Sequence, residues 1–340
     1  MPDTDDSDGA RPNRRHVGPT DLDARSWRFV ARSTMRKFAD DGAGDIAAAL
    51  TFHAVLALIP SMLVAVSIIA LLGRESTPVS FVLEVVRAVA PEDAAERLGE
   101  IVDDLTESAI GGLPLLLGLG LTVWAIARYI AVLGRGMNRA YEVEEGRAPW
   151  SIKIAQLLAA VVVIVATAAA ILVLAASGSV AKAAGEVLGL GETGVVIWRI
   201  LRWPVLLAIV IATIAFLYDR APNVRHPRFR WLSWGATLTV VVLVVASALY
   251  GLYATTIVDY ERVYGIFAGV IISLLWLWIA NLALVLGVEF DAALERAREL
   301  RAGLPADKSP RLPPRDRSRI ARKQARRTAE IIEARRLRGR

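Results

Sequence analysis

The sequence predicts an all-α polytopic membrane protein with six transmembrane helices, both termini on the cytoplasmic side (N-in/C-in), and a short external amphipathic helical cap. Three observations predict this class. Hydrophobic residues make up 55% of the 340 residues. The charged residues, 22% of the chain, gather at its two ends and in a few short loops. The basic residues among them alternate from one connection to the next.

Six apolar stretches have the length that a spanning helix needs, about 20 residues at ~1.5 Å of rise each. These runs are too long for strands, and a soluble fold could not cover six of them. The fourth run is short unless its helix begins upstream. We expect the spans at about residues 47–72, 113–133, 154–176, 203–218, 232–253 and 266–288.

The distribution of lysine and arginine predicts the orientation. Both termini and the second and fourth connections are basic, the third and fifth connections carry few basic residues, and the long first connection is acidic. Basic loops stay on the cytoplasmic side of a membrane. We therefore expect a multi-pass protein of the inner (cytoplasmic) membrane with both termini in the cytoplasm.

Two segments outside the spans carry helical patterns. In residues 25–45 the side chains of Trp27, Val30, Ala31, Met35 and Phe38 share one face, with arginines around them. This pattern predicts an interfacial amphipathic helix, with a cytoplasmic helix packed on the loops as the alternative. Residues 77–110 predict an external helical cap, either packed on the spans or gating a cavity.

The two ends of the chain flank the six-helix membrane domain, residues 46–294. Residues 1–24 begin with an acidic run and are expected to be a disordered cytoplasmic tail. Residues 295–340 form a basic cytoplasmic tail, with thirteen Lys/Arg against four acidic residues from position 302 onward. We expect membrane lipids as partners, with anionic headgroups at this tail and at the basic loops. No nucleic acid is expected, because no aromatic stacks or known module accompany the charge. Oligomerisation stays open.

Polar residues at membrane depth are functional candidates because burying them in hydrocarbon is costly. A neutral, hydrogen-bonded imidazole is the alternative for His53, and Pro60 removes a helix donor and favours a kink. The guanidinium of Arg128 must extend to the membrane–water interface, pair with an acidic group, or face water. Glu289 could pair with Arg128 or Arg135. The candidates are His53, Pro60, Arg128, Arg199, Arg202, Asn281 and Glu289, of which Arg199 and Arg202 are either interfacial anchors or the outer mouth of an anion-attracting cavity.

The sequence gives little support for an enzyme. The chain has no cysteine, so thiolate metal sites and thiol catalysis are excluded. Its three histidines fall in a tail, a span and a loop, and no nucleotide-binding loop or nucleophile elbow is present. We therefore expect no catalytic residues, no metal and no cofactor.

Four segments together resemble a known family: AAALTFHAVLALIPSML, MNRAYEVEEGRAPW, APNVRHPRFRWLSWGA and YGIFAGVIISLLWLWIANLALVLGVEFDAAL. Over roughly residues 25–300 the chain resembles the YihY/BrkB family of bacterial inner-membrane proteins, once labelled ribonuclease BN. The resemblance implies six helices and a link to export of envelope lipid or lipopolysaccharide. His53 stands where the family commonly has an aromatic residue. The family motif positions in the loops are Asn138, Arg139, Tyr141, Pro222, Asn223 and Arg225, and Gly287 and Glu289 are motif positions of the last span.

The functional prediction is a transporter or exporter of an envelope lipid or another amphipathic anion. The alternative is a non-transporting membrane scaffold for envelope assembly. Ribonuclease activity is not expected, because a metal-dependent nuclease needs several histidine and carboxylate ligands that converge on one site.

Overall fold

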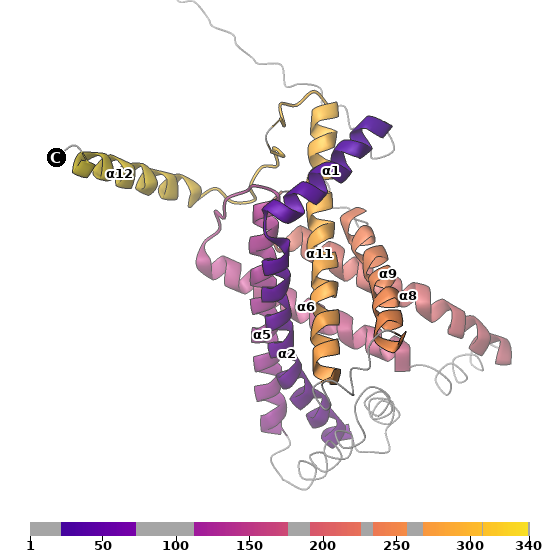
Figure 1. The fold of residues 1–340 in the computed structure, drawn as a ribbon. Coiled ribbons are helices and arrows are strands. Elements are labelled where there is room, and N and C mark those ends of the chain that lie inside the picture. The colour runs from indigo at the N-terminus through magenta and orange to yellow at the C-terminus, as the bar shows by residue number, and fades with distance from the viewer. Residues whose placement is uncertain are drawn as a thin grey trace, which may run out of the picture.

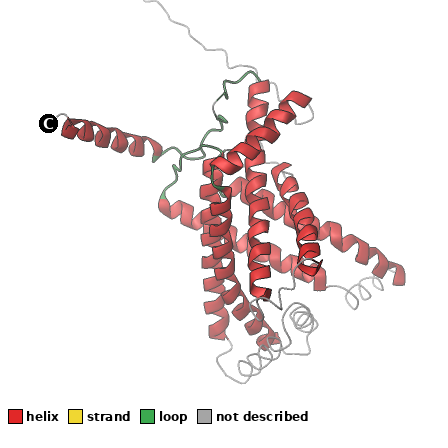
Figure 2. Cartoon of the chain, in the orientation of Figure 1, coloured by secondary structure: helices red, strands yellow, loops and turns green. Residues whose placement is uncertain are grey.

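The computed structural model describes residues 22–72, 112–175, 191–225, 234–256, 268–307 and 309–338. Within these ranges every regular element is an α-helix (Figure 2), and Val224 forms an isolated antiparallel bridge with Pro314. The helices are α1 (Ala24–Asp40), α2 (Ala43–Leu72), α5 (Gly112–Ala140), α6 (Pro149–Ala175), α8 (Gly191–Arg220), α9 (Trp234–Thr256), α11 (Ala268–Arg301) and α12 (Ile320–Arg338).

Six of these helices are long and apolar enough to cross a membrane, which confirms the predicted all-α, six-span class. They are α2, α5, α6, α8, α9 and α11. Each carries an apolar window with at most two charged residues. The expected cap at 77–110 and residues 1–21 lie outside the described residues.

Several helices are longer than their apolar runs. Helix α5 continues seven residues beyond the expected end at 133, and α11 continues thirteen beyond 288. Helix α8 begins at Gly191, twelve residues before the expected start at 203. Hydropathy marks only the part of a helix that suits lipid, whereas backbone hydrogen bonding continues through charged turns. Arg128 therefore lies deeper in its helix than the sequence indicated.

The six long helices form a closed ring in chain order. Each packs against the next, from α2 through α5, α6, α8 and α9 to α11, and α11 returns to α2. Helix α11 also contacts α5 inside the ring. Figure 1 shows α2, α5 and α11 running nearly upright and side by side, whereas α6 and α8 cross the view obliquely.

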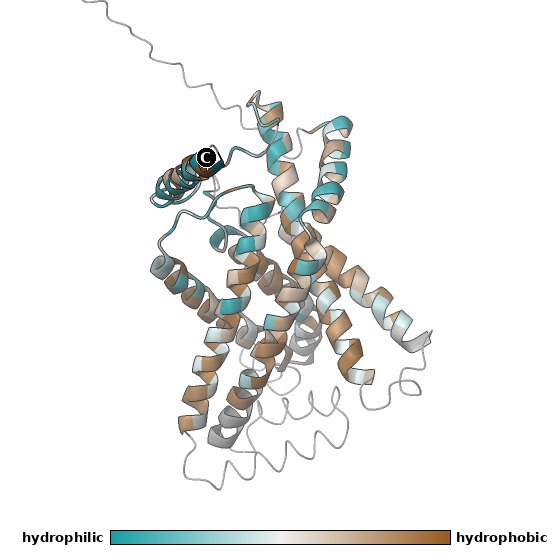
Figure 3. Cartoon of the chain, turned by 60° about the vertical axis from the view of Figure 1, so that its left-hand side comes forward, coloured by the Kyte–Doolittle hydropathy of each residue, from teal (hydrophilic) through white to brown (hydrophobic). Residues whose placement is uncertain are grey.

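The buried core gathers at the end of the bundle that carries α1, called the α1 end below. Its largest fully buried side chains include Leu50, Leu133, Met137 and Tyr141. Figure 3 shows hydrophilic residues gathered at this end and apolar residues along the rest of the long helices. The apolar surface there suits a lipid environment, because lipid removes the need to bury it.

Helix α1 lies across the end of α11 (Figure 1). Val30 is fully buried in a cluster with Leu294 and Ala297, and Trp27 stacks on Phe290 at 6.3 Å between ring centroids. The Asp23 carboxylate pairs with Arg301 at 2.6 Å. Helix α1 thus packs on α11 with Val30, Ser33 and Thr34 buried, while Met35 of the expected apolar face is 57% exposed.

Helix α12 projects from the α1 end, away from the other helices, in Figures 1 and 3. None of its residues is buried. The sequence had marked this segment only as a basic tail. Its alanine, glutamine, glutamate and arginine content favours helix, which explains why it is helical without packing.

Candidate functional site

The antiparallel contact between α2 and α5 sets which residues of the two helices lie level. A Cβ placed on Gly136 would lie 3.1 Å from Ile46 Cγ2, and one placed on Gly118 would lie 3.3 Å from the carbonyl oxygen of Pro60. Numbering rises along one helix as it falls along the other. His53 therefore lies level with roughly residues 125–129 of α5.

Two arginines on α5 point away from the bundle. Arg128 and Arg135 are both exposed, and neither guanidinium has a hydrogen bond or ion pair with the part of the chain that the structure describes. Seven residues separate them, which corresponds to ~10.5 Å of rise and ~20° around the helix. They therefore share one face of α5.

The part of this α5 face that precedes Arg128 in the chain is apolar. Leu117, Leu121 and Trp124 precede Arg128 at helical spacing and are 57%, 53% and 56% exposed. The candidate span covers Leu115–Ala140, so Arg128 lies near its middle by length. A cationic pair thus follows an apolar strip along the outer face of one spanning helix.

His53 completes this arrangement from α2. Its ring is half-buried, and it meets the Phe52 ring edge-on at 5.5 Å between centroids. Among the described residues, Arg128 and Arg135 are the charged side chains that interact electrostatically with the imidazole. We call the group formed by His53, Arg128 and Arg135 the cationic seam.

The inner face at the same level is polar but fully paired. The Asn281 side chain accepts a 2.7 Å hydrogen bond from the Tyr129 hydroxyl and donates to Thr51 Oγ1 at 3.1 Å and to the Leu277 carbonyl at 2.9 Å. These bonds join α5, α11 and α2. With its amide satisfied, Asn281 ties three helices together and offers no open group to a ligand.

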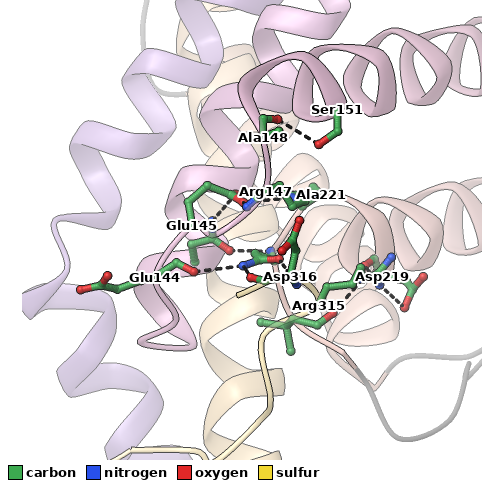
Figure 4. A network of polar contacts seen from close by, with 12 residues as sticks. Glu144, Glu145, Arg147, Ala148, Ser151, Asp219, Ala221, Arg315 and Asp316 are labelled. Atoms are coloured by element: carbon green, nitrogen blue, oxygen red, sulfur yellow. Dashed lines mark hydrogen bonds and ion pairs between the residues drawn. The ribbon is translucent and has the colours of Figure 1, made fainter. Parts of the chain in front are cut away.

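A second polar group lies at the α1 end. It joins the loop after α5 (residues 141–148), the loop after α8 (residues 221–225) and the segment before α12 (residues 311–319), and we call it the clasp. Figure 4 shows these three segments meeting.

Asn223 is the centre of the clasp and is fully buried. Its backbone amide donates to Asn138 Oδ1 at 2.7 Å, and its side-chain amide donates to the carbonyls of Glu144 and Asp316 at 3.1 and 3.0 Å. Its Oδ1 accepts from the Asp316 amide at 3.1 Å. The backbone carbonyl of Asn223 accepts from the Arg315 amide at 2.9 Å. This asparagine of the loop after α8 thus hydrogen-bonds to the other two segments and to the end of α5.

Two arginines reinforce the clasp (Figure 4). Arg147 holds the Glu145 carboxylate through two bonds of 2.9 and 2.8 Å and donates to the Ala221 carbonyl at 2.9 Å. Arg315 donates to the carbonyl of Asp219 at 2.7 Å. Burial raises the pKa of Glu145, but the hydrogen bonds from Arg147 outweigh it and leave that pKa below its ordinary value. The clasp therefore holds its carboxylate ionised.

The other loop-motif residues also serve packing at this end. Arg139 donates to the Asp41 carbonyl at 2.9 Å, and Tyr141 and Pro222 are buried. Arg225 has an exposed side chain, and its backbone amide donates to the Pro313 carbonyl at 2.9 Å.

The remaining candidates lie apart from the seam. Pro60 and Pro204 stand inside α2 and α8. Arg202 lies over the Trp203 ring at 5.2 Å, and its buried Nε has no hydrogen bond to the described part of the chain. Arg199 belongs to α8, but its side chain lies outside the described part.

Glu289 is also separate from the seam. It is 1% exposed, and its Oε2 has no hydrogen-bond partner among the residues that the structure describes. Its anticipated ion pair with Arg128 or Arg135 is not formed, because Glu289 is buried inside the bundle while both arginines lie on the outer face of α5.

The residues that complete the clasp carry no strong signal in the sequence. Glu145, Arg147, Arg315 and Asp316 were not candidates, although the Pro-Pro-Arg-Asp-Arg-Ser run before α12 carries a turn signal. The Asp316 carboxylate accepts the Ser318 amide at 2.8 Å, a local bond typical of Asp at a turn. In the described ranges no three His, Cys, Asp or Glu residues converge in a way that could hold a metal ion.

Comparison with known proteins places the chain in a family. The family model described as "Virulence factor BrkB" matches residues 34–311. The Bacillus subtilis (strain 168) protein named "Putative ribonuclease-like protein YfkH" is 24% identical over 253 residues, which cover 74% of this chain and 90% of that protein. A "UPF0761 membrane protein" of Chromobacterium violaceum is 27% identical over 274 residues, covering 78% of this chain and 61% of that protein.

A "UPF0761 membrane protein" of Pseudomonas aeruginosa (strain LESB58) is 26% identical over 282 residues, covering 79% of this chain and 63% of that protein. The chain thus spans about three fifths of the length of these two UPF0761 relatives. No solved structure matches the chain. The match to the family model covers most of the sequence and agrees with six apolar spanning helices. The chain is a membrane protein of the BrkB family.

Proposed function

We propose that this protein exports an amphipathic anion, with an envelope lipid as the leading substrate class. The observation that carries the proposal is Arg128, an exposed guanidinium near the middle of a candidate span, without a partner among the described residues. A charge at that depth is costly, so such a residue is a functional candidate by default, and a substrate pathway is one of the roles it can serve. Arg135 and His53 add polar groups at the same face.

The proposal includes the setting in which export would occur. Both termini face the cytoplasm of the inner membrane, and the clasp lies on the cytoplasmic side. The protein is not an enzyme under this proposal. The ribonuclease term in the name of the Bacillus protein belongs to that protein.

The test is translocation of a labelled lipid in proteoliposomes. The full chain is reconstituted with NBD-labelled phosphatidylglycerol, and dithionite reports the label that has moved between leaflets. We expect movement with the native chain and with Arg220→Ala, whose exposed arginine lies at the end of α8. Arg128→Ala is expected to lose most of it. Equal rates of lipid movement with Arg128→Ala and Arg220→Ala, or no movement with the native chain, would contradict the proposal.

A scaffold for envelope assembly is the second candidate, and one observation favours it. Helix α12 has no buried residue and presents seven basic residues against Glu330 and Glu333. Such a helix can hold anionic lipid or an acidic partner without any transport. Deleting residues 320–340 removes α12 and leaves the clasp, so it separates the two candidates. A scaffold loses its function in this deletion and keeps it in Arg128→Ala, whereas an exporter behaves in the opposite way.

A further inference from the structure

The described polar groups of α5 differ sharply between its two faces. Toward the bundle, Tyr129 bonds to Asn281, and the Thr122 hydroxyl donates to the Gly118 carbonyl at 2.7 Å. Away from the bundle, Arg128 and Arg135 have no partner in the described ranges. Unsatisfied polar groups are where a ligand gains most. The open hydrogen-bonding capacity of α5 therefore lies on its outer face.

The seam has the chemistry of a phosphate site. A guanidinium presents a planar fork of N–H donors that matches phosphate oxygens and stays charged at every physiological pH. Arg128 and Arg135 are ~10.5 Å apart along the helix axis, and their long side chains can close on one headgroup from two sides. His53, level with Arg128, can donate a further hydrogen bond from its ring.

The apolar strip beside the seam suits an acyl chain. From Leu117 to Arg128 the helix rises ~16 Å, about half of the ~30 Å hydrocarbon core. Leu117, Leu121 and Trp124 each expose more than half of their surface along that distance. A molecule bound at the seam through an anionic headgroup would therefore lay its apolar part along this strip.

We infer that the cationic seam binds the headgroup of an anionic phospholipid, which reaches it sideways from the surrounding bilayer while its acyl chains stay along the Leu117–Trp124 strip. This inference rests on the proposed function for the identity of the lipid as substrate, but lipid binding itself does not require transport. It locates recognition on the outer surface of α2 and α5, outside the ring of helices.

Photocrosslinking tests the inference on the full chain. The protein is placed in phosphatidylcholine nanodiscs that contain phosphatidylglycerol with a diazirine in one acyl chain, and crosslinked peptides are identified by mass spectrometry. We expect labelling of α5 between residues 117 and 124. The double variant Arg128→Gln/Arg135→Gln is expected to reduce this labelling about tenfold, because both charge-assisted contacts are removed. Arg128→Lys retains the positive charge but lacks the planar fork of N–H donors. Its labelling is expected to lie between that of the native chain and that of the double variant.

Controls separate the alternatives. Arg220→Ala should label α5 like the native chain, and monodisperse elution with unchanged helical content shows that each variant is folded. Equal α5 labelling by diazirine phosphatidylcholine would mean unselective contact with bulk lipid and would overturn the inference. Loss of labelling in millimolar inorganic phosphate would assign the site to a soluble anion instead. Labelling that survives the double variant would also overturn it. Selective labelling without lipid translocation would leave the site standing and remove the proposed function.

Discussion

The backbone amide of Asn223 donates a 2.7 Å hydrogen bond to the side chain of Asn138, 85 residues earlier in the chain. The bond joins the end of α5 to the loop that follows α8. The Asn138 side chain also donates to Glu145 at 3.0 Å, so Asn138 connects the end of α5 both to the loop after α5 and to the loop after α8. The sequence resemblance predicts both residues as motif positions, and their pairing gives them a structural role in this fold.

Replacing Asn223 with alanine is expected to loosen the clasp. The change removes three side-chain hydrogen bonds and leaves buried backbone groups of Glu144 and Asp316 unpaired, at a cost of about 3 kcal/mol. Limited proteolysis by trypsin should then cut after the arginines of 311–319 much faster than in the native chain. Arg225→Ala is the control, because that residue enters the clasp through its backbone. An unchanged cutting rate in Asn223→Ala would show that the clasp does not hold the tail.

The clasp is expected to weaken in acid. The pKa of Glu145 is lowered from its ordinary value of 4.5 in the folded protein, so the unfolded chain binds more protons in that range. Its stabilising contribution is present above the unfolded pKa and is lost as the pH falls through the folded pKa. Thermal unfolding in detergent from about pH 6 to about pH 3 measures this loss. Glu145→Gln should reduce the loss of thermal stability at low pH. Glu144→Gln, at a more exposed ion pair, should leave that loss unchanged.

Gly287 is expected to be essential for the contact between α9 and α11. A Cβ at this position would overlap Thr239 Oγ1 and would lie 2.6 Å from the Gly235 carbonyl oxygen. Gly287→Ala must separate the helices and should lower the free energy of unfolding by about 1–3 kcal/mol. Gly269→Ala in the same helix meets no atom within 4 Å, and there the gain in helix propensity should leave stability equal or higher. Chemical unfolding of both variants compares them directly, and equal stability would argue against a close crossing.

Glu289→Gln is expected to preserve or raise stability. The carboxyl group is 1% exposed, and its Oε2 makes no hydrogen bond within the described part of the chain. An ionised carboxylate would be costly at such a position. Glutamine keeps the shape without the charge, whereas Glu289→Ala leaves a cavity and should cost about 2 kcal/mol. Thermal unfolding of the two variants separates these effects. Destabilisation of Glu289→Gln as large as that of Glu289→Ala would mean that the charge itself stabilises the fold.

The class of the fold could be predicted because hydrophobicity is a local property. Six apolar runs of spanning length identify six helices wherever the chain places them. The helix ends were less predictable: α5 and α11 continue through charged turns whose residues resemble loop in composition. In α1 the apolar pattern indicated one face, but the buried face is centred on Val30, Ser33 and Thr34, because contact with α11 decides which side is covered.

The sequence by itself determined that Arg128 is a charge inside an apolar helix. It also predicted, by resemblance to a family, that Asn138 and Asn223 are motif positions. Tertiary structure alone decided that Arg128 and Arg135 point outward beside His53, that Asn281 is fully paired, and that Asn223 hydrogen-bonds to a segment more than ninety residues away. Helical periodicity fixes which residues share a face. Which face meets lipid and which meets protein depends on how each helix is rotated and on what it packs against, and no single helix encodes that choice.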